Sequence, residues 1–586
     1  MINNSLEVEL QLWQSYLDIG LQQQIWSDRL CTMAKTNDFK LCQQYVITYI
    51  QNIKQQLNEC QLELSKQSQP YRMTTLPFDQ IDDRLKETVD HERKYLSTRN
   101  NNQLLKFKDD IHEKELFRII FTYRLTTDQR YGPDSNDDID IQCLSAKGAM
   151  SDNFVKVSNT LFEINGERYT YLGTNFWYGL NLGSGGPGGD RNRLIRELDR
   201  LKLMGINNLR IQAGSEGPDT EPYRMLPSLQ RSPGDYNVEV LEGLDFLLNE
   251  MRKRQMYAIM CLNNFWNWSG GMAQYLVWSG VVTTIPYPPP AINGNWSQYQ
   301  QFTSQFYSNQ RAMEIFNAHI RFIVNHTNTY TKVVYKNDPT IMAWELANEP
   351  RGGINKEDYF NWINSTSMLI KNLDPNHLVT IGSEGATSSL SSGTNFERDH
   401  SFVSIDYTTI HIWVQNWDIY KPNDATETYP KAIEFARKYI DDHEKIAKNL
   451  NKPLVLEEFG ISRDQNSHDP QSTTTIRDKY YTEIFDYVYS KAVNGGIVAG
   501  CNFWAWAGEG RPRINEGLWK LNDSFIGDPP HETQGWYSVY DTDLYTREII
   551  EKYATKMNGV GLIYDGPRQT LLIAIYTMLS LLVKII

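Results

Sequence analysis

Apolar and polar positions in the first part of the chain follow a helical pattern. Between 39 and 64, apolar residues recur every three or four positions, which marks one buried face of a long helix. A second helical stretch is expected at 113–123. The segment 127–142 is rich in Asp and in turn-forming residues, which is typical of a linker. We therefore expect a mostly helical N-terminal region, 1–125, followed by an acidic linker, 126–160.

Beyond residue 161 the pattern changes, and short apolar runs alternate with amphipathic helical stretches. Helical periodicity is clear at 194–205, where Gly205 supplies a stop signal, and at 429–450. Eight strands alternating with helices predict an α/β fold, a (β/α)8 TIM barrel, over 161–556. The eight expected strands are 169–176, 207–212, 257–263, 340–348, 377–383, 407–413, 453–459 and 499–506.

An open doubly wound sheet is the structural alternative to the barrel. Such a sheet usually carries a glycine-rich phosphate loop after its first strand. The run NLGSGGPGG at 181–189 is rich in glycine, but it matches neither GxGxxG nor GxxxxGK[ST]. We interpret it as a flexible loop, and the barrel is favoured.

The two ends of the chain give conflicting indications of location. The first twenty residues lack a basic segment, an unbroken apolar run and a small-residue cleavage site. The tail 570–586 is hydrophobic, with Lys584 as the single charge after Leu571. It suits a short membrane anchor, a GPI-attachment signal or an amphiphilic segment docked on the protein. With sequons at Asn267, Asn295, Asn325, Asn364 and Asn522, we expect an extracellular or cell-surface protein.

Composition narrows the classes of partner. The 586 residues carry a formal net charge of -13, which argues against nucleic-acid binding. Of the 15 Trp residues only Trp13 and Trp26 precede position 160, so the barrel region holds rings that could stack on sugars or fill the core. The six cysteines form no CxxC pair and no zinc-type cluster, so we expect no metal and no cofactor. Cys261 and Cys501 fall on strands that are not neighbours, and we expect free thiols there.

Reactive side chains of a TIM barrel gather at the carboxyl ends of its strands. That rule places two carboxylates on different strands, Glu349 after the fourth and Glu458 on the seventh, among amides and aromatic rings. Glycoside hydrolysis needs such a pair, one group protonated to release the leaving oxygen and one ionised to attack or to activate water. No Ser/His pair or metal cluster competes with them at these positions.

Four ordered motifs carry a family resemblance. WELANEP at 344–350, HIW at 411–413, VLEEFG at 455–460 and NFWAWAGEGRP at 502–512 each fall at an expected strand end. Together they resemble glycoside hydrolase family 5, and more narrowly its endo-β-1,4-mannanases. The stretch 523–541 also matches the C-terminal region of that group. The resemblance covers about 160 to 555, and it leaves out the N-terminal region and the tail.

The resemblance implies a retaining double displacement with Glu349 as acid/base and Glu458 as nucleophile, their carboxyls about 5–5.5 Å apart. Glu349 then needs a raised pKa, which the charge of Glu458 would help to supply. Because side chains alternate along a strand, we expect only one of Glu457 and Glu458 to face the interior. Glu345, within the fourth strand, is expected to be a buried, hydrogen-bonded carboxylate.

The supporting residues follow from the same resemblance. Arg210 would hold Glu458 ionised, and Asn348 would bind the sugar 2-hydroxyl. His411 would orient the nucleophile or bind sugar, and Trp504 would form the platform under the sugar at the cleavage point, while Trp506 points into the core. For each of these a structural role is the alternative. More distant substrate contacts are expected, with a structural role equally open, from Trp413, Trp177, Asn264 and Arg511.

The sequence therefore predicts a retaining endo-hydrolase of internal β-1,4-mannosidic linkages in mannan, glucomannan or galactomannan. A cellulase-type β-1,4-glucanase of the same fold is the nearest alternative, because mannose and glucose differ only in the configuration at the 2-hydroxyl. A carbohydrate-binding pseudo-enzyme is a second alternative, although the presence of both carboxylates argues against it. A third hypothesis makes the N-terminal helices an interaction module that places a barrel enzyme at a partner protein.

Overall fold

The computed structural model describes residues 154–387 and 392–560. The chain divides into two compact units, Met1–Ile139 and Asp140–Ile586, and the described residues all belong to the second. The expected N-terminal helices and the hydrophobic tail lie outside the described residues. Within the described part of the chain, no helix is long and apolar enough to cross a membrane.

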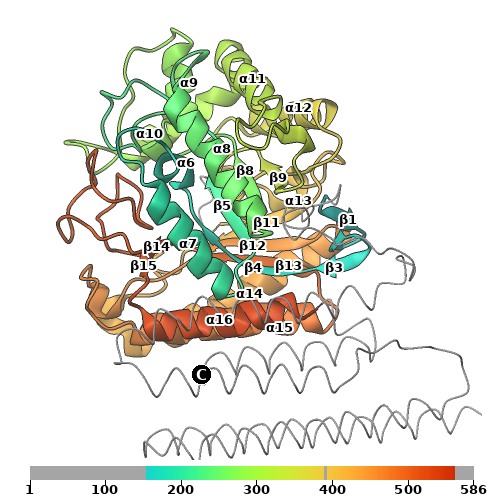
Figure 1. The fold of residues 1–586 in the computed structure, drawn as a ribbon, viewed down its shortest axis with the longest axis vertical. Helices are drawn as coiled ribbons and strands as arrows, with labels where there is room; N and C mark the ends of the chain where they lie inside the picture. Colours follow the sequence, from blue (N-terminus) through green and yellow to red (C-terminus); the bar gives the residue numbers. More distant parts are fainter. Residues whose placement is uncertain (1–153, 388–391, 561–586) are drawn as a thin grey trace, which may run out of the picture. The chain divides into compact units, whose positions relative to one another are not determined.

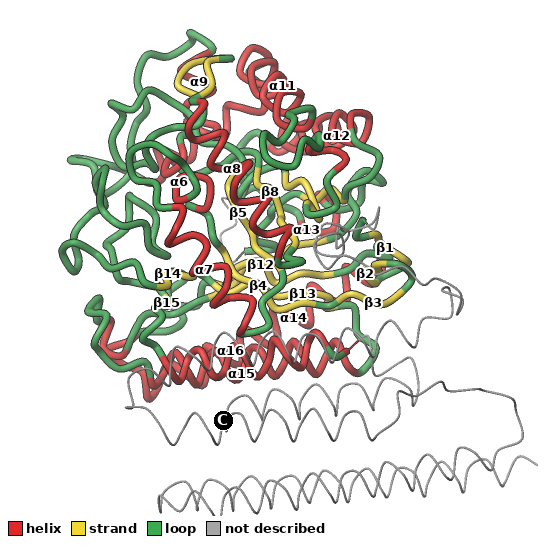
Figure 2. The backbone as a smooth tube through the Cα atoms, in the orientation of Figure 1, coloured by secondary structure: helices red, strands yellow, loops and turns green. Residues whose placement is uncertain are grey.

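The described unit is the predicted TIM barrel (Figures 1 and 2). Its eight strands pair in parallel, and the last strand returns to the first. Two main-chain hydrogen bonds, from Asp406 to Val379 at 2.8 Å and from His411 to Glu384 at 3.1 Å, join the two strands at which the sheet pairing ends. The barrel strands are β4 (Tyr171–Asn175), β5 (Asn208–Gln212), β8 (Tyr257–Cys261), β9 (Ile341–Glu345), β10 (Leu378–Thr380), β11 (Thr408–Ile412), β12 (Leu454–Phe459) and β13 (Val498–Phe503).

All eight expected strands are present, each within a few residues of its predicted bounds. Short strands on the loops form two small two-stranded sheets. One pairs β6 (Gln230–Ser232) with β7 (Asp235–Tyr236), and the other pairs β14 (Trp506–Gly508) with β15 (Val539–Tyr540). The helices are α6 (Gly179–Leu182), α7 (Arg191–Leu203), α8 (Val238–Lys253), α9 (Gly271–Trp278), α10 (Trp296–Thr303), α11 (Gln310–Val324), α12 (Lys356–Leu373), α13 (Phe396–Asp399), α14 (Ala425–Asn449), α15 (Thr475–Val493) and α16 (Leu544–Asn558).

Local signals fix the bounds of α7. The side chain of Asp190 accepts a hydrogen bond from the backbone N–H of Arg193 and so caps the first turn. Gly205, with a φ of 82°, ends the helix two residues beyond its last turn, as expected. The helix begins three residues before the predicted start, because the capping residue lies outside the apolar pattern. The glycine-rich run 181–189 is not wholly a loop, since its first two residues belong to α6.

A three-stranded antiparallel sheet closes the N-terminal end of the barrel. It consists of β1 (Lys156–Ser158), β2 (Leu161–Ile164) and β3 (Glu167–Tyr169). Phe162 and Tyr169 on this sheet pack with the first residues of the barrel strands in one buried cluster. The range predicted for the acidic linker, 126–160, therefore extends too far, because residues 156–158 already form strand β1 of this three-stranded sheet.

The last helix fastens the end of the described chain to its beginning. Thr170, just before β4, donates a hydrogen bond to the carbonyl of Met557 at 2.5 Å, and Asn558 donates one to the carbonyl of Gly205 at 2.8 Å. Figure 1 shows α15 and α16 side by side below the barrel. Cys261 and Cys501 are buried free thiols, which confirms the expectation for this pair.

The interior of the barrel leaves no room for a side chain at Gly500. A Cβ there would lie 2.3 Å from the ring of Tyr171 on the neighbouring strand. We expect Gly500→Ala to lower the free energy of unfolding by about 1–3 kcal/mol, because the ring cannot move out of the packed core. Thermal or urea unfolding measures the change. Gly185→Ala, where the nearest atom would be 3.8 Å away, is the matched control and should unfold like the wild type.

Candidate active site

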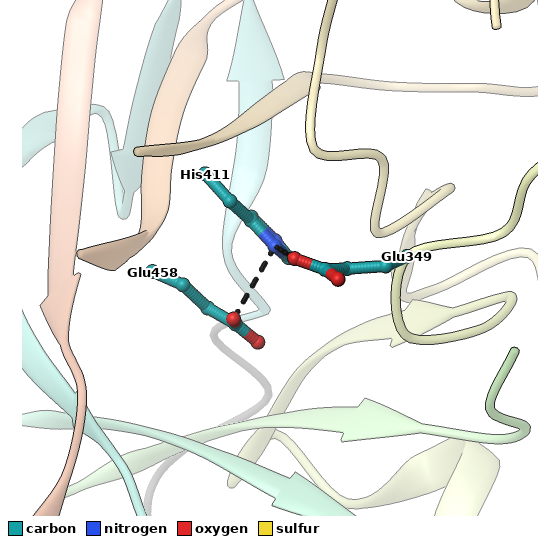
Figure 3. A group of neighbouring side chains, drawn as sticks. All are labelled: Glu349, His411 and Glu458. Carbon is teal, nitrogen blue, oxygen red and sulfur yellow. Dashed lines mark hydrogen bonds and ion pairs between the residues drawn. The ribbon is translucent and has the colours of Figure 1, made fainter. Parts of the chain in front are cut away.

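Three titratable side chains meet at the carboxyl ends of the strands (Figure 3). Glu349 follows β9, His411 lies on β11 and Glu458 lies on β12. The Nδ1 atom of His411 is 2.7 Å from Oε1 of Glu349 and 3.4 Å from Oε2 of Glu458. All three side chains are buried. The strand-end rule therefore brings together the two carboxylates and the histidine that it selected.

The spacing of the two carboxylates bears on the stereochemistry of a reaction. One oxygen of each carboxylate and a ring nitrogen of His411 lie within 4.8 Å of one another. Carboxyl pairs of retaining glycosidases lie about 5–5.5 Å apart, whereas inverting enzymes need about 6.5–9.5 Å to admit a water molecule. The geometry therefore fits attack by Glu458 on a sugar carbon better than activation of a water between the two groups.

Arg210, on β5, binds acidic and amide groups that stand on or just after three other strands, β4, β9 and β12. Its guanidinium donates to Glu458, to both oxygens of Glu345 at 2.6 and 2.8 Å and to Asn348 at 2.8 Å. A further bond runs to Asn175 at 3.0 Å. Glu345 is fully buried and satisfied by this arginine, as the sequence analysis expected. Arg210 thus holds Glu458 and Asn348 in fixed positions and provides a cation beside the expected nucleophile.

A β-bulge in β12 changes the orientation of Glu457. Ile410 of β11 pairs with Leu456, whereas the next residue, His411, pairs with Glu458, so Glu457 is an extra residue on its strand. Its Oε2 atom lies 3.7 Å from Nε2 of His411 and 3.9 Å from Nε of Arg210. The expectation that only one of the two neighbouring glutamates faces the interior is therefore wrong, because the bulge interrupts the alternation on which it depended.

The pKa values of the three groups depend on one another. Burial raises the pKa of Glu349, but the hydrogen bond and the charge of His411 outweigh it and lower this pKa to about 2. Burial raises the pKa of Glu458 to about 7 against the opposing charges of His411 and Arg210. Burial lowers the pKa of His411, but the charge of Glu458 and the bond to Glu349 raise it to about 10.

The expected raised pKa of Glu349 is thus not found in this structure. The raised pKa of His411 favours a proton on its ring, one hydrogen bond away from Glu349. The sequence analysis considered only the charge of Glu458 on Glu349 and left out the imidazole between them. In this arrangement Glu349 can act as an acid once a proton moves along the 2.7 Å bond from Nδ1 of His411.

The backbone at Glu349 adopts an unusual conformation. Its φ is 47°, in the left-handed region that residues other than glycine seldom occupy. The N–H of Glu349 donates to the carbonyl of Gly382 at 2.9 Å, and the N–H of Asn348 donates to the carbonyl of Asn263 at 2.9 Å. These bonds to the neighbouring strand ends maintain a conformation that costs about 1–3 kcal/mol, as is common at functional sites.

Three residues of the site escaped the sequence analysis. The indole N–H of Trp266 donates to Oε2 of Glu349 at 2.7 Å. The guanidinium of Arg351 lies 5.0 Å from the Trp266 ring and binds both oxygens of Glu384 at 2.7 and 2.9 Å. Trp266 follows the end of the third strand by only a few residues, so the strand-end rule could have selected it. Arg351 and Glu384 occupy similar positions after the fourth and fifth strands.

Glu532 is a further acidic group that the sequence analysis left out. Burial and the charges of Asp528, Glu458 and Glu349 raise its pKa well above the ordinary value. The neighbouring His531 has its ring 6.2 Å from that of Trp296, which in turn lies 5.6 Å from Trp266. The loop after β13 therefore brings a carboxyl group and an imidazole to the same side of the site as Trp266. Both residues lie inside the stretch 523–541 that carried part of the resemblance.

Two of the expected aromatic contacts lie beside Glu458. The indole N–H of Trp413 donates to Oε2 of Glu458 at 3.2 Å. The rings of Trp413 and Trp504 are 5.8 Å apart and nearly perpendicular, so Trp504 is one ring away from the carboxylate. Trp506 donates to Glu197 at 3.0 Å in the buried core, which is the structural role expected for it.

The remaining three candidates make their contacts with the protein itself. Trp177 is 2% exposed and donates its indole N–H to the carbonyl of Gly527 at 2.9 Å. Asn264 is fully buried, accepts a bond from Asn348 and donates one to Ser269, so it supports Asn348 within the site. Arg511 binds the carbonyl of Gly508 and the carboxylate of Asp541. A substrate contact from each of these three residues stays a prediction.

Glu349, His411 and Glu458 could in principle offer three ligand atoms to a metal ion. Arg210 opposes this use, because its guanidinium already binds Glu458 and would repel a divalent cation. The raised pKa of His411 also keeps a proton on the ring, whereas a metal ligand must be unprotonated. The donor set therefore fits acid–base and nucleophilic chemistry better than metal binding.

A paired carboxylate site at the carboxyl end of a (β/α)8 barrel, with a fixed arginine and indole groups around it, defines a glycoside hydrolase. Comparison with known proteins gives the family. The model for GH family 5 beta-mannosidase-like proteins matches residues 152–561, more than half of the chain. The chain therefore belongs to glycoside hydrolase family 5.

Relatives in sequence and in structure carry mannan-related names. Mannan endo-1,4-beta-mannosidase 5 of Solanum lycopersicum is 32% identical over 391 residues, which cover 64% of this chain and 86% of the relative. The glycoside hydrolase family 5 mannosidase from Rhizomucor miehei is 40% identical, with a TM-score of 0.65, over 70% of this chain and 99% of that one. The endo-beta-1,4-mannanase from Thermotoga petrophila is 28% identical, with a TM-score of 0.50, over 67% and 78%.

The raised pKa of His411 predicts a loss of stability in mild alkali. Its charged form stabilises the fold fully below the ordinary pKa of 6.5, and this contribution disappears as the pH rises towards about 10. Between pH 7 and 10 we expect His411→Gln to show a shallower fall in the free energy of unfolding than the wild type. Urea titrations at several pH values measure the slope.

His443→Gln is the matched control for this measurement. Burial lowers the pKa of His443 to about 4, so its ring stays neutral throughout the alkaline range. Its substitution should leave the slope of the wild type unchanged. An identical slope for His411→Gln and the wild type would contradict the assignment of a proton to His411.

Proposed function

We propose that this protein is a retaining endo-hydrolase of internal β-1,4-mannosidic linkages in mannan, glucomannan or galactomannan. The observation that carries the proposal is the pair Glu349 and Glu458 within 4.8 Å of one another, with Arg210 bound to the second. The family gives this pair its substrate class, because relatives in both comparisons are named for mannan or mannosides.

In the first half of the reaction, Glu458 attacks the anomeric carbon and Glu349 donates a proton to the leaving oxygen. Arg210 and the indole N–H of Trp413 hold the attacking carboxylate in place. Formation of the glycosyl ester removes the charge of Glu458. In the second half, Glu349 takes a proton from water, whose oxygen attacks the same carbon and breaks the bond to Glu458.

Discrimination between mannose and glucose takes place at the 2-hydroxyl. Asn348 is the candidate for this contact, because its carbonyl oxygen accepts from Arg210 at 2.8 Å and its amide group donates to Asn264 at 3.2 Å, which fixes the side chain beside the acid/base. A hydrogen bond to the 2-hydroxyl would strengthen as charge develops on the sugar ring. This fixed amide supports a preference for one configuration at that carbon.

Release of single mannosyl units from chain ends is a second candidate activity. It is favoured by the description of the matching family as beta-mannosidase-like and by the Rhizomucor miehei relative, a mannosidase whose variant was crystallised with mannosyl-fructose. The two activities differ in their effect on a polymer. Internal cleavage lowers the viscosity of a mannan solution with few new reducing ends, whereas cleavage at chain ends releases mannose with little loss of viscosity.

Substitutions of the two carboxylates test the catalytic assignments. We expect Glu349→Ala and Glu458→Ala each to lower kcat on mannan by about 10³-fold or more, since each removes a group that acts in the transition state. On an aryl mannoside with a good leaving group, Glu349→Ala should keep its glycosylation burst, because such a group departs without a proton. Glu458→Ala should show none.

The control for these variants is Glu434→Gln, an exposed glutamate on α14. It should match the wild type on every substrate. Rapid loss of mannan viscosity with little action on soluble cellulose is the expected result for the wild type. A preference for cellulose would overturn the substrate, and equal activity of the wild type and both alanine variants would overturn the mechanism.

We also propose that the enzyme works outside the cell or at its surface, where polymeric mannan is accessible. Of the five sequons in the described part of the chain, those at Asn295, Asn325, Asn364 and Asn522 are exposed, whereas Asn267 is buried. Protein isolated from its natural source should therefore lose apparent mass on treatment with an N-glycosidase. Peptide mass spectrometry should find glycans at the exposed sites and not at Asn267; unmodified asparagines throughout would count against the proposal.

A further inference from the structure

Glu457 is a buried carboxyl group that the proposed reaction does not use. Its side chain is fully buried, and neither of its oxygens has a hydrogen-bond partner within the described residues. The Nε2 atom of His411, 3.7 Å away, also lacks a partner there. An unpaired buried carboxyl is expensive, so a residue of this kind needs an explanation. The bulge in β12 gives one, because without the extra residue this side chain would point away from the barrel interior.

Two features of the surroundings limit what Glu457 can do. The hydroxyls of Tyr171 and Tyr407 are buried and unpaired within the described residues, and burial, with a smaller effect from the charge of Glu457, raises the pKa of each. Arg210 lies on its other side, with Nε at 3.9 Å. The carboxyl is thus enclosed at the floor of the site, where a sugar cannot reach it. Its action on the reaction must pass through a neighbouring side chain, and His411 is the neighbour that also contacts Glu349.

We propose that Glu457 is a positioning residue that binds the Nε2 proton of His411 and thereby keeps Nδ1 of His411 a donor to Glu349. The three side chains form a row, with the imidazole between the buried carboxyl and the acid/base. A neutral imidazole carries one ring proton, which could sit on either nitrogen. A carboxyl at Nε2 stabilises the form protonated on both nitrogens, as the carboxylate partners of other catalytic histidines do.

The proton balance of this row is simple. The Nδ1 proton of His411 moves to Oε1 of Glu349, which leaves a neutral imidazole whose remaining proton is bound by Glu457. Glu349 then gives the proton it received from Nδ1 to the leaving oxygen, as the glycosidic C–O bond breaks and the bond between the sugar and Glu458 forms. In the second half Glu349 takes a proton from the attacking water and can return it to His411. The inference rests on the proposed function only in this last use of the proton.

Other charged groups act on His411 and are included in the balance. Glu458 on β12 lies 3.4 Å from Nδ1, and Glu384 after β10 faces the same ring through its charge. Arg210 on β5 faces Glu457, and Arg351 after β9 acts on Glu349. Of these groups, Glu458 lies at the Nδ1 side of the His411 ring. Glu384, Arg210 and Arg351 act on the ring at longer range. Glu457 is the group placed at Nε2.

Glu457→Gln tests the proposal, because it keeps the shape of the side chain and removes its charge. We expect the basic limb of kcat/KM on mannan, whose leaving group needs the proton, to move to lower pH by about one unit or more, as the removal of a charge at this range predicts. Glu457→Asp should restore part of the shift. If Glu457 only supports the fold, Glu457→Gln will lower activity at every pH and leave the basic limb in place. That result would overturn the proposal.

A second measurement does not depend on activity. NMR of the ring nitrogens in histidine-labelled protein, with the signal assigned from His411→Gln, reports the protonation of His411 directly. The wild-type ring should stay doubly protonated beyond pH 8, and Glu457→Gln should lower its pKa. Titration of His411 near its ordinary pKa in the wild type would overturn the proposal even if the glutamine variant failed to fold. Inactive wild type with this titration intact would count only against the proposed function.

Glu216→Gln is the matched control. Glu216 is also a fully buried glutamate, and it accepts hydrogen bonds from the N–H of Gly271 at 2.8 Å and from the hydroxyl of Tyr275 at 3.2 Å. Its substitution removes a buried carboxyl at a distance from His411. The basic limb and the NMR titration of His411 should both match the wild type, whereas a shift equal to that of Glu457→Gln would show a general effect of buried charge and overturn the proposal.

Discussion

The guanidinium of Arg210 is the interaction on which the rest of the site depends. It binds Glu345, Glu458, Asn348 and Asn175, which come from three strands of the barrel. A buried cation with so many acceptors is stable only when all of them are in position, and each buried carboxylate needs the cation in return. The barrel therefore closes correctly around this one group, and the nucleophile is placed as part of the same arrangement.

His411 has the corresponding role for protons. It lies between the two carboxylates and beside a third, so three negative groups in a small volume share the protons of a single ring. Without an imidazole there, mutual repulsion would force one of the carboxylates to become neutral. With the imidazole of His411 in place, Glu349 and Glu458 can both be ionised, and the imidazole can still supply a proton to Glu349. Glu349 can thus alternate between acid and base with only a short movement of one hydrogen, while Glu458 stays the nucleophile.

The sequence was sufficient for the barrel, because eight apolar runs at regular intervals and the helices between them follow from simple periodicity. It was also sufficient for Arg210, Asn348, Glu349, His411 and Glu458, since each stands at a strand end. It failed where geometry departs from the rule, because the bulge turns Glu457 inward. Glu532 reaches the site from a loop whose path depends on distant contacts, which no local pattern reveals. Trp266, by contrast, follows its strand closely enough for the strand-end rule to have selected it.

The hydrogen bonds that join α16 to the start of β4 and to Gly205 have a consequence for synthesis of the chain. Every residue of the carboxylate pair emerges from the ribosome before β13, which pairs with β4 and completes the ring. The bonds from Thr170 to Met557 and from Asn558 to Gly205 form only after a further fifty or so residues. A nascent chain thus holds both reactive groups but no closed barrel to align them. We therefore expect activity to begin only after β13 and α16 have joined the start of the barrel.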